Sequence, residues 1–181
     1  MADRDDVRLS KHLSLVLRHR PGSVGLELDP RGWVEVAALL AALGQHGRSV
    51  TREDLDRVVR TNDKQRFEWD RAGDRIRARQ GHSVPVELGL APAEPPAVLF
   101  HGTTQRVVAA ILAEGLGRQQ RHHVHLSPDA ATARRVGARR GEPVVLEVDA
   151  AGMARAGHRF WRTANGVWLA DRVPPEFLTP G

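Results

Sequence analysis

The spacing of apolar residues predicts three short helices in the first sixty positions of the chain. The first covers residues 7–18, where four apolar side chains recur at helical spacing and share one face. A second apolar run covers residues 36–43. Thr51 followed by Asp54 resembles a capping box, with aspartate in place of glutamate, and predicts the start of a third helix.

Segments that alternate between apolar and polar residues predict two hairpins around these helices. Residues 26–28 and 33–34 flank an Asp-Pro-Arg-Gly turn, and residues 66–69 and 75–78 flank an Arg-Ala-Gly-Asp turn. Helices followed by a β hairpin are typical of winged-helix-like domains. Such domains commonly bind nucleic acid, although this link is an analogy from fold alone.

The pattern changes after the Pro-rich stretch at residues 88–97, which is typical of a linker. We therefore expect domains at residues 1–87 and 98–181, the second with an α+β fold. Its strands are expected at 98–100, 123–126, 144–148 and within 160–169, and its helices at 104–114 and from Ser127 or Asp129 to residue 139. The helix over 104–114 is expected to bury Val107, Val108, Ile111 and Leu112.

The composition narrows the class of protein. The net charge is +5, and of the 27 basic residues only Lys11 and Lys64 are lysines. Arginine presents a planar fork of donors that suits phosphate, which favours a nucleic acid or nucleotide partner, although arginine usage reflects genome composition equally well. The absence of cysteine excludes disulfides and thiolate nucleophiles. The charged N-terminus and the lack of a long apolar stretch predict a cytoplasmic protein without membrane contact.

Two basic clusters could bind an anion. Arg18-His19-Arg20 falls in the last turn of the first predicted helix, where a cation favours the helix dipole and where arginine and imidazolium could also clamp one phosphate. The segment Asn62–Phe67 joins the third helix to a strand, and alternation places Arg66 on the face opposite Phe67. A solvated run of charges explains this second cluster as well.

Histidines mark two further candidate positions. His101-Gly102-Thr103 ends an apolar strand just before a helix, where ligands bind in sheet proteins and where a helix N-terminus attracts phosphate. In residues 121–127, alternation puts His123 and His125 on one face of a strand and His122 on the other. Two histidines without a carboxylate make a poor zinc site, so we expect a polar cleft edge rather than a metal. The sequence has no glycine-rich dinucleotide loop.

Taken together, these motifs resemble those of the NAD-dependent RNA 2′-phosphotransferases, best known from tRNA splicing. The resemblance covers nearly the whole chain, and its specificity comes from the order and spacing of motifs that are weak one by one. The motifs are LSKHLSLVLRH at 9–19, GWV at 32–34, NDKQRF at 62–67, QGHS at 80–83, FHGT at 100–103, VHLS at 124–127 and NGVWL at 165–169.

The resemblance implies an N-terminal winged-helix-like lobe and a C-terminal lobe like that of the ADP-ribosyltransferases. It also implies a catalytic set, which falls here on Arg18, His19, Arg66 and Arg121, with Arg118 as a neighbouring alternative to the last.

In the second lobe, the resemblance makes His101 and His125 the two histidines that face NAD. We expect Gly102, Thr103 and Ser127 to line the same cleft. The chain has no tyrosine, so the His-Tyr-Glu pattern of protein-modifying ADP-ribosyltransferases is not available to it.

The implied reaction has two steps. The RNA 2′-phosphate attacks C1″ of the NAD ribose and expels nicotinamide, and the ribose O2″ then attacks the attached phosphate. The products are RNA with a free 2′-OH, nicotinamide and ADP-ribose 1″,2″-cyclic phosphate. An anionic nucleophile needs positioning rather than a strong base, and fixed cations stabilise the crowded phosphate. NAD is then a co-substrate, and no metal is required.

Two other functions stay open at this point. A winged-helix regulator would use the first domain and the basic charge, but it does not explain FHGT or VHLS. A nucleic-acid ADP-ribosyltransferase that stops after the first step would share the NAD site, but it would not need four phosphate-binding groups. For the 2′-phosphotransferase, the partners are NAD and an RNA bearing a 2′-phosphate, and we expect a monomer.

Overall fold

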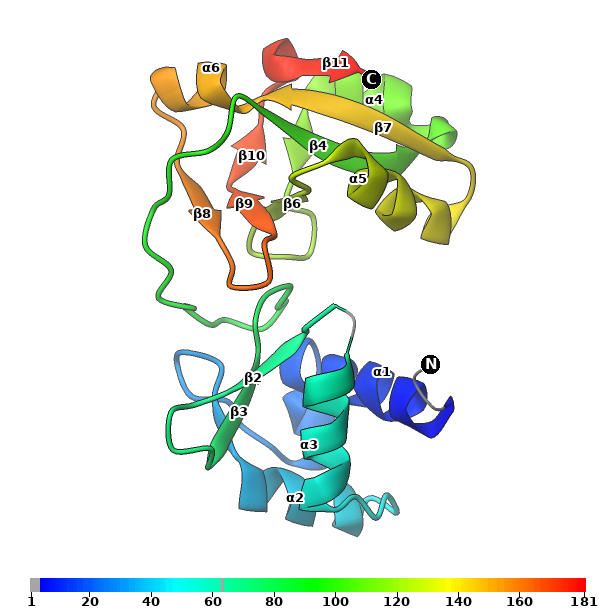
Figure 1. Ribbon diagram of the computed structural model, residues 1–181, viewed down its shortest axis with the longest axis vertical. Helices are drawn as coiled ribbons and strands as arrows, with labels where there is room; N and C mark the ends of the chain where they lie inside the picture. The colour runs from blue at the N-terminus through cyan, green and yellow to red at the C-terminus, as the bar shows by residue number, and fades with distance from the viewer. Residues whose placement is uncertain (1–3, 63) are drawn as a thin grey trace. The chain divides into compact units, whose positions relative to one another are not determined.

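The computed structural model describes residues 4–62 and 64–181, with the backbone alone at residue 140. The chain divides into two compact units, unit 1 (Met1–Gly89) and unit 2 (Leu90–Gly181) (Figure 1). Part of the Pro-rich stretch belongs to unit 2, because the amide of Ala93 donates to the carbonyl of Phe160 at 2.8 Å and Pro92 forms an isolated bridge with Trp161.

Unit 1 combines helices with a small antiparallel sheet. Its elements are α1 (Arg4–Arg18), η1 (Pro21–Val24), β1 (Val34–Glu35), α2 (Val36–Gln45), α3 (Arg52–Thr61), β2 (Phe67–Trp69) and β3 (Arg75–Ala78). The strands pair in the order β1-β3-β2, with Val34 opposite Ile76 and Phe67 opposite Ala78. The three helices and the hairpin of β2 and β3 confirm the sequence predictions, although α1 begins earlier than expected, at Arg4.

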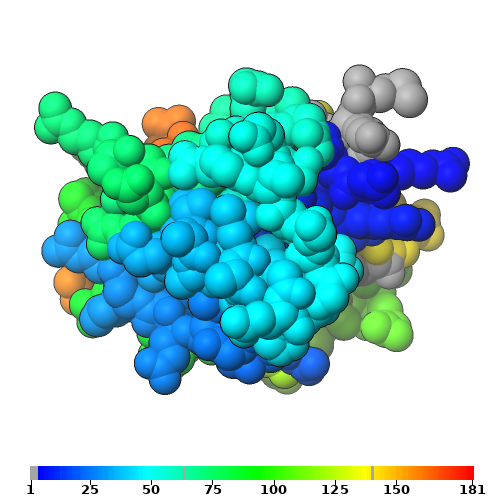
Figure 2. Space-filling model, turned by 90° about the horizontal axis from the view of Figure 1, so that it is seen from below, coloured from blue at the N-terminus to red at the C-terminus, as the bar shows by residue number. Residues whose placement is uncertain are grey.

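The apolar faces of these helices meet the sheet in the core of unit 1, and residues of α2 and α3 cover one face of the unit in blue and cyan (Figure 2). Burying one such side chain stabilises the fold by about 1.5–3 kcal/mol. The largest fully buried side chains in this core are Leu13, Leu17, Leu39, Leu43, Leu55, Phe67 and Ile76.

Polar contacts fix α3 at its start and against α1. The predicted capping box is confirmed: the Thr51 hydroxyl accepts from the amide of Asp54 at 3.2 Å, and the Asp54 carboxylate accepts from the amide of Thr51 at 3.0 Å. Further along α3, Arg57 Nε donates to Oδ1 of the buried Asp6 at 2.9 Å. This ion pair joins α3 to the first turn of α1.

The predicted hairpin over residues 26–34 is wrong in its first arm. Residues 26–28 form no strand, and Leu26 is instead buried in the core. The turn itself is present, because the Asp29 carboxylate accepts from the amides of Arg31 and Trp33 at 2.8 Å each. Val34 then pairs with β3, a partner far along the chain that local alternation could not indicate.

Unit 2 is built from short strands and helices. Its elements are β4 (Val98–Thr104), α4 (Gln105–Glu114), β5 (Leu116–Gly117), β6 (Val124–Leu126), α5 (Ala130–Gly137), η2 (Ala138–Arg140), β7 (Pro143–Asp149), α6 (Ala150–Arg155), β8 (Phe160–Arg162), β9 (Trp168–Ala170), β10 (Arg172–Val173), η3 (Pro175–Phe177) and β11 (Leu178–Pro180). The strands pair antiparallel in the orders β11-β7-β4, β6-β9-β8 and β10-β5.

The predicted strands and helices of unit 2 are all present, and of the two caps predicted for α5, Asp129 is the one that forms. Two details differ from the prediction. Val107 is 37 % exposed rather than buried, because α4 packs on the core only through Val108, Ile111 and Leu112. The elements α6, β5, β10 and β11 were not predicted, since each is too short to show a period.

Both units mix helix and strand, so the protein belongs to the mixed α and β class. Among the described residues, no helix combines the length and the apolar character that crossing a bilayer requires.

Candidate functional site

Arg18 and His19 lie where α1 ends. The amides of His19 and Arg20 both donate to the carbonyl of Leu15, at 3.0 and 2.9 Å, so the chain leaves the helix only after these basic residues. Arg18 is partly buried and His19 is exposed. The C-terminal end of a helix carries partial negative charge, which stabilises cations placed there.

The loop at residues 80–84 closes over this end of α1. The amide of Ser83 donates to the carbonyl of Arg18 at 2.9 Å, which satisfies one of the carbonyls that a helix end leaves without a helical partner. The hydroxyl of Ser83 lies 2.9 Å from Nδ1 of His19. Gly81, at φ +86°, lies beside the Arg18 side chain, and His82 is buried against Gly32. The loop therefore orients both basic residues.

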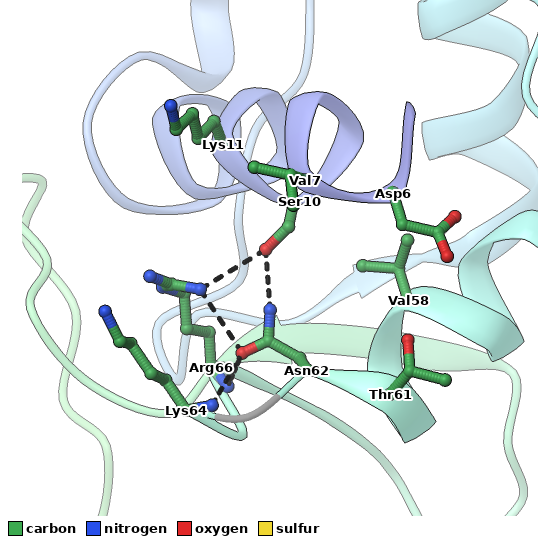
Figure 3. A pocket seen from close by; sticks show the side chains of 9 residues that line it. All are labelled: Asp6, Val7, Ser10, Lys11, Val58, Thr61, Asn62, Lys64 and Arg66. Carbon is green, nitrogen blue, oxygen red and sulfur yellow. Dashed lines mark hydrogen bonds between the residues drawn. The ribbon is translucent and has the colours of Figure 1, made fainter. Parts of the chain in front are cut away.

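Arg66 approaches α1 from the turn that follows α3 (Figure 3). Its Nη1 donates to Oδ1 of Asn62 at 3.3 Å and to the hydroxyl of Ser10 at 3.5 Å. Asn62 Nδ2 in turn donates to the Ser10 hydroxyl at 2.7 Å. The same Asn62 oxygen accepts from the amides of Lys64 and Arg66, at 3.1 and 3.4 Å. Asn62 thus organises the turn and connects Arg66 to the helix that ends in Arg18. Asp63, within the same motif, lies outside the described residues.

His101 on β4 and His125 on β6 are brought together in unit 2. Phe100 and Ser127 exchange backbone hydrogen bonds of 2.9 and 2.7 Å, which joins the two strands. Nδ1 of His101 lies 3.1 Å from the carbonyl of His125, and Nδ1 of His125 lies 3.1 Å from the carbonyl of His123. A carbonyl only accepts, so Nδ1 carries the proton in both rings. In each neutral ring, Nε2 is then an acceptor.

Gly102 has a packing role that sequence reasoning did not predict. Helix α5 crosses β4 so closely that a Cβ added at Gly102 would lie 1.8 Å from the carbonyl oxygen of Ala133. On the helix side, a Cβ at Gly137 would lie 2.7 Å from the carbonyl oxygen of Thr103. Both glycines are therefore required for the two backbones to approach. A cofactor contact at Gly102 or Thr103 stays a prediction.

Arg121 and the neighbouring histidines lie in and next to the segment between β5 and β6. Arg121 is exposed, and its amide donates to the carbonyl of Arg118 at 3.0 Å. His123 packs its ring against Trp161, with 5.0 Å between the ring centroids, and this burial lowers the pKa of His123. Among residues 4–62 and 64–181, no three or more histidine, aspartate or glutamate side chains gather into a possible metal site.

Apart from Arg121, the predicted site residues therefore form two groups, one in each unit. Arg18 and His19 share the end of α1 in unit 1, and Arg66 is joined to the same helix through Ser10. His101 contacts the backbone of His125 in unit 2, beside Ser127. Sequence reasoning gave no role to Ser10, Asn62 and Ser83, which hold the basic residues in place. The signal was present, since all three lie within the motifs quoted above.

The comparisons with known proteins cover both units. The model of the family described as "RNA 2'-phosphotransferase, Tpt1 / KptA family" matches residues 4–172. A protein of Streptomyces griseus subsp. griseus named "Probable RNA 2'-phosphotransferase" is 58% identical over 185 residues, which is 98% of either chain. Proteins of the same name from Streptomyces coelicolor and Nostoc punctiforme are 56% and 51% identical over 178 residues. These alignments span 98% of this chain and 97% and 98% of theirs.

Proposed function

The chain belongs to the RNA 2′-phosphotransferase family, and on that premise we propose that it transfers the 2′-phosphate of an RNA to NAD. The products are RNA with a 2′-OH, nicotinamide and ADP-ribose 1″,2″-cyclic phosphate. Unit 1 is the winged-helix-like lobe that binds the RNA phosphate, and unit 2 is the ADP-ribosyltransferase-like lobe that binds NAD.

The observation that carries the proposal is the set of oriented basic side chains in unit 1. Arg18 and His19 are held by the loop that contains Ser83, and Arg66 is held by Asn62 and Ser10. Side chains fixed in this way keep their charges aimed without reorganisation when an anion arrives. Hydrogen bonds from guanidinium to phosphate are also among the strongest that proteins form. A group of this composition suits a dianionic phosphate monoester.

In the first step, a 2′-phosphate oxygen forms a bond to C1″ of NAD while the bond from C1″ to the nicotinamide nitrogen breaks. The nucleophile is already an anion, so no residue has to remove a proton. Arg18, Arg66 and Arg121 position the phosphate, and holding two reactants in line supplies much of the rate. Nicotinamide leaves as a neutral molecule, because the cationic ring accepts the bonding electron pair.

In the second step, O2″ of the ribose attacks phosphorus, loses its proton to solvent, and the bond from phosphorus to the RNA O2′ breaks. The departing oxygen needs a proton. The imidazole of His19 is positioned by Ser83, and an imidazole can carry a proton on either nitrogen, so His19 donates that proton or holds the phosphate. The arginines stabilise the charge that gathers on the phosphate.

NAD is a substrate of this reaction, and the residues of unit 2 fit it chemically. With Nδ1 committed to carbonyl oxygens, Nε2 of each neutral ring is the acceptor nitrogen, the kind of atom to which a ribose hydroxyl donates, and that of His125 is buried in the lobe. Thr103 and Ser127 add hydroxyl groups close to these histidines along β4 and after β6. The two rings and the two hydroxyls together suit the polar riboside end of NAD.

The test is to incubate the protein with NAD and an oligonucleotide that carries one internal 2′-phosphate. We expect nicotinamide and dephosphorylated RNA in equal amounts. The matched control is the same oligonucleotide with a 2′-OH, which should release no nicotinamide above background. Nicotinamide release with the phosphate still on the RNA, as a stable adduct, would show an ADP-ribosyltransferase that stops after the first step. Absence of both products would contradict the proposal.

A further inference from the structure

A hollow of about 260 Å³ opens in unit 1 between α1, α3 and the turn before β2 (Figure 3). Its wall carries three cationic side chains, from Lys11, Lys64 and Arg66, and one carboxylate, from Asp6. The carboxylate is engaged by Arg57 at 2.9 Å, so it does not neutralise the lysines. The wall therefore has the charge of an anion-binding site. Its lining residues are Asp6, Val7, Ser10, Lys11, Val58, Thr61, Asn62, Lys64 and Arg66.

The distribution of lysine in the chain sets this hollow apart. Of the 27 basic residues, Lys11 and Lys64 are the only lysines, and both line it although they are far apart in sequence. Figure 3 shows Lys64 and Arg66 side by side below α1 and Asp6 on the opposite side of the hollow; Lys11 lies on α1, and its flexible side chain is drawn pointing away from the other two. A lysine ammonium is a compact charge with three donors on a flexible stem. Because the stem is flexible, the ammonium can keep its contact with a phosphate that is not held in one orientation.

Arg66 connects the hollow to the proposed catalytic group. Its Nη1 is bonded to Asn62 and Ser10, which also line the hollow, and the guanidinium is thereby fixed at the wall. In an RNA, the phosphodiester next to a 2′-phosphate is the nearest second anion. If Arg66 contacts the 2′-phosphate, that phosphodiester is the next anion within reach of the hollow.

We propose that this hollow binds a backbone phosphodiester of the RNA substrate, adjacent to the nucleotide that carries the 2′-phosphate, through Lys11 and Lys64. The inference rests on the proposed function, since it names how the same RNA is held. The hollow fixes the register of the strand, and the reactive phosphate is held by other groups. Loss of the lysines therefore affects binding of RNA and leaves the chemical steps unchanged once RNA is saturating.

The test compares Lys11→Ala, Lys64→Ala and the double variant with Arg71→Ala, which removes one equal charge from an exposed turn residue of unit 1. Both lysines are exposed, so their removal leaves the core intact. RNA affinity is measured without NAD, on a 2′-phosphorylated oligonucleotide and on one whose flanking linkages are neutral methylphosphonates. We expect each lysine variant to bind the natural oligonucleotide about tenfold more weakly, with kcat unchanged. The slope of log affinity against log salt should fall by about 0.7 per lost contact.

The methylphosphonate arm decides where the lysines act. In the parent protein, replacing the flanking linkages with methylphosphonates should reduce RNA affinity as much as the double lysine substitution does. In the double variant, the same replacement should cause no further loss of affinity. Lysine variants that bind like Arg71→Ala would overturn the inference, as would equal methylphosphonate losses in the parent and the double variant. Lysine-dependent binding of inorganic phosphate, with no methylphosphonate effect, would show a site for free anions and would also overturn it. The proposed function is judged separately, by nicotinamide release in the parent protein.

Discussion

The hydroxyl of Ser83 lies 2.9 Å from Nδ1 of His19, although the two residues are 64 positions apart. The contact is reinforced by the amide of Ser83, which donates to the carbonyl of Arg18 at 2.9 Å. The imidazole is therefore held from its Nδ1 side. One serine thus links a loop to the orientation of the proposed acid.

Replacing Ser83 with alanine should slow the second chemical step by about 10- to 100-fold, because the ring of His19 loses its orientation. The pH–rate profile should shift as well, since a hydrogen-bond partner of the imidazole is gone. Ser83→Thr should restore both properties. The measurement is single-turnover phosphate transfer over a pH series, with circular dichroism to establish folding. An unchanged pH profile in a slow, folded Ser83→Ala variant would assign the serine a purely structural role.

Much of the fold follows from local signals. The capping box of Thr51 and Asp54 marks the start of α3, and apolar spacing marks α1 and α2. These signals involve residues a few positions apart, so the chain itself reveals them. The strand pairing of Val34 with Ile76 and the burial of Leu26 depend on distant partners, and no local pattern indicates them.

In the candidate site, too, the sequence indicates some residues and not others. Arg18, His19 and Arg66 were predicted from motifs, because charged residues in a fixed order are visible in the sequence. The residues that hold them, such as Asn62 and Ser83, are small polar groups whose partners lie on other elements. Gly102 was predicted as a ligand contact, whereas its packing against α5 could be recognised only from the structure.

Replacing His101 with asparagine and replacing it with glutamine should have different effects on NAD binding. Asparagine can reproduce a donor near the position of Nδ1, and glutamine a polar atom near that of Nε2. If Nε2 accepts from NAD, His101→Gln should retain more NAD affinity than His101→Asn, and His101→Ala should bind most weakly. Isothermal titration of NAD into the three folded variants measures this order. Equal affinity in the alanine variant and the parent would remove His101 from the NAD site.

Replacing Gly102 with alanine should destabilise unit 2 by about 1–3 kcal/mol, the usual cost of overpacking. The added Cβ would lie 1.8 Å from the Ala133 carbonyl oxygen, so α5 must move away from β4. Gly117 is the matched control, because a Cβ there would meet nothing within 4 Å. Gly117→Ala should change stability by no more than about 0.5 kcal/mol. Urea unfolding of both variants tests the difference, and equal stabilities would mean that α5 adjusts without cost.

The turn between β2 and β3 should make the stability of unit 1 depend on pH in the acid range. The Asp70 carboxylate accepts from Arg75 Nε at 3.0 Å and from the amides of Gly73, Asp74 and Arg75 at 2.8, 3.0 and 3.2 Å. The hydrogen bond from the Arg75 side chain is the main cause that lowers the pKa of Asp70, and the three amides add to it.

Because the folded-state pKa of Asp70 lies below the unfolded value, its contribution is complete above about pH 4 and is lost as the pH falls through the folded-state pKa. Asp70→Asn should therefore be less stable than the parent at neutral pH, and its stability should fall less steeply in acid. Asp74→Asn, at an exposed position in the same turn, should behave like the parent. Urea midpoints at several pH values make the comparison, and parallel curves for Asp70→Asn and the parent would exclude the effect.

The two chemical steps should respond differently to loss of the basic residues. The first step needs an oriented anion, whereas the second needs charge stabilisation at phosphorus and a proton for the departing RNA oxygen. If Arg18, His19 and Arg66 act mainly in the second step, their alanine variants should still release nicotinamide and should accumulate RNA that carries a 2′-phospho-ADP-ribose adduct. Removing one positioned donor typically costs about 10²–10³ in rate, so the adduct should outlast the first turnover.

Single-turnover reactions with excess NAD, resolved on a gel, measure both steps in each variant. Arg121 belongs to the other unit and is expected to position the phosphate in the first step, so Arg121→Ala should slow nicotinamide release as well. Arg71→Ala, at an exposed turn, should show parental rates and no adduct. If the four site variants instead lose both steps equally and no adduct forms, the residues act together as a binding clamp. Assigning them to the second step would then be wrong, because a group that only holds the phosphate contributes equally to both attacks.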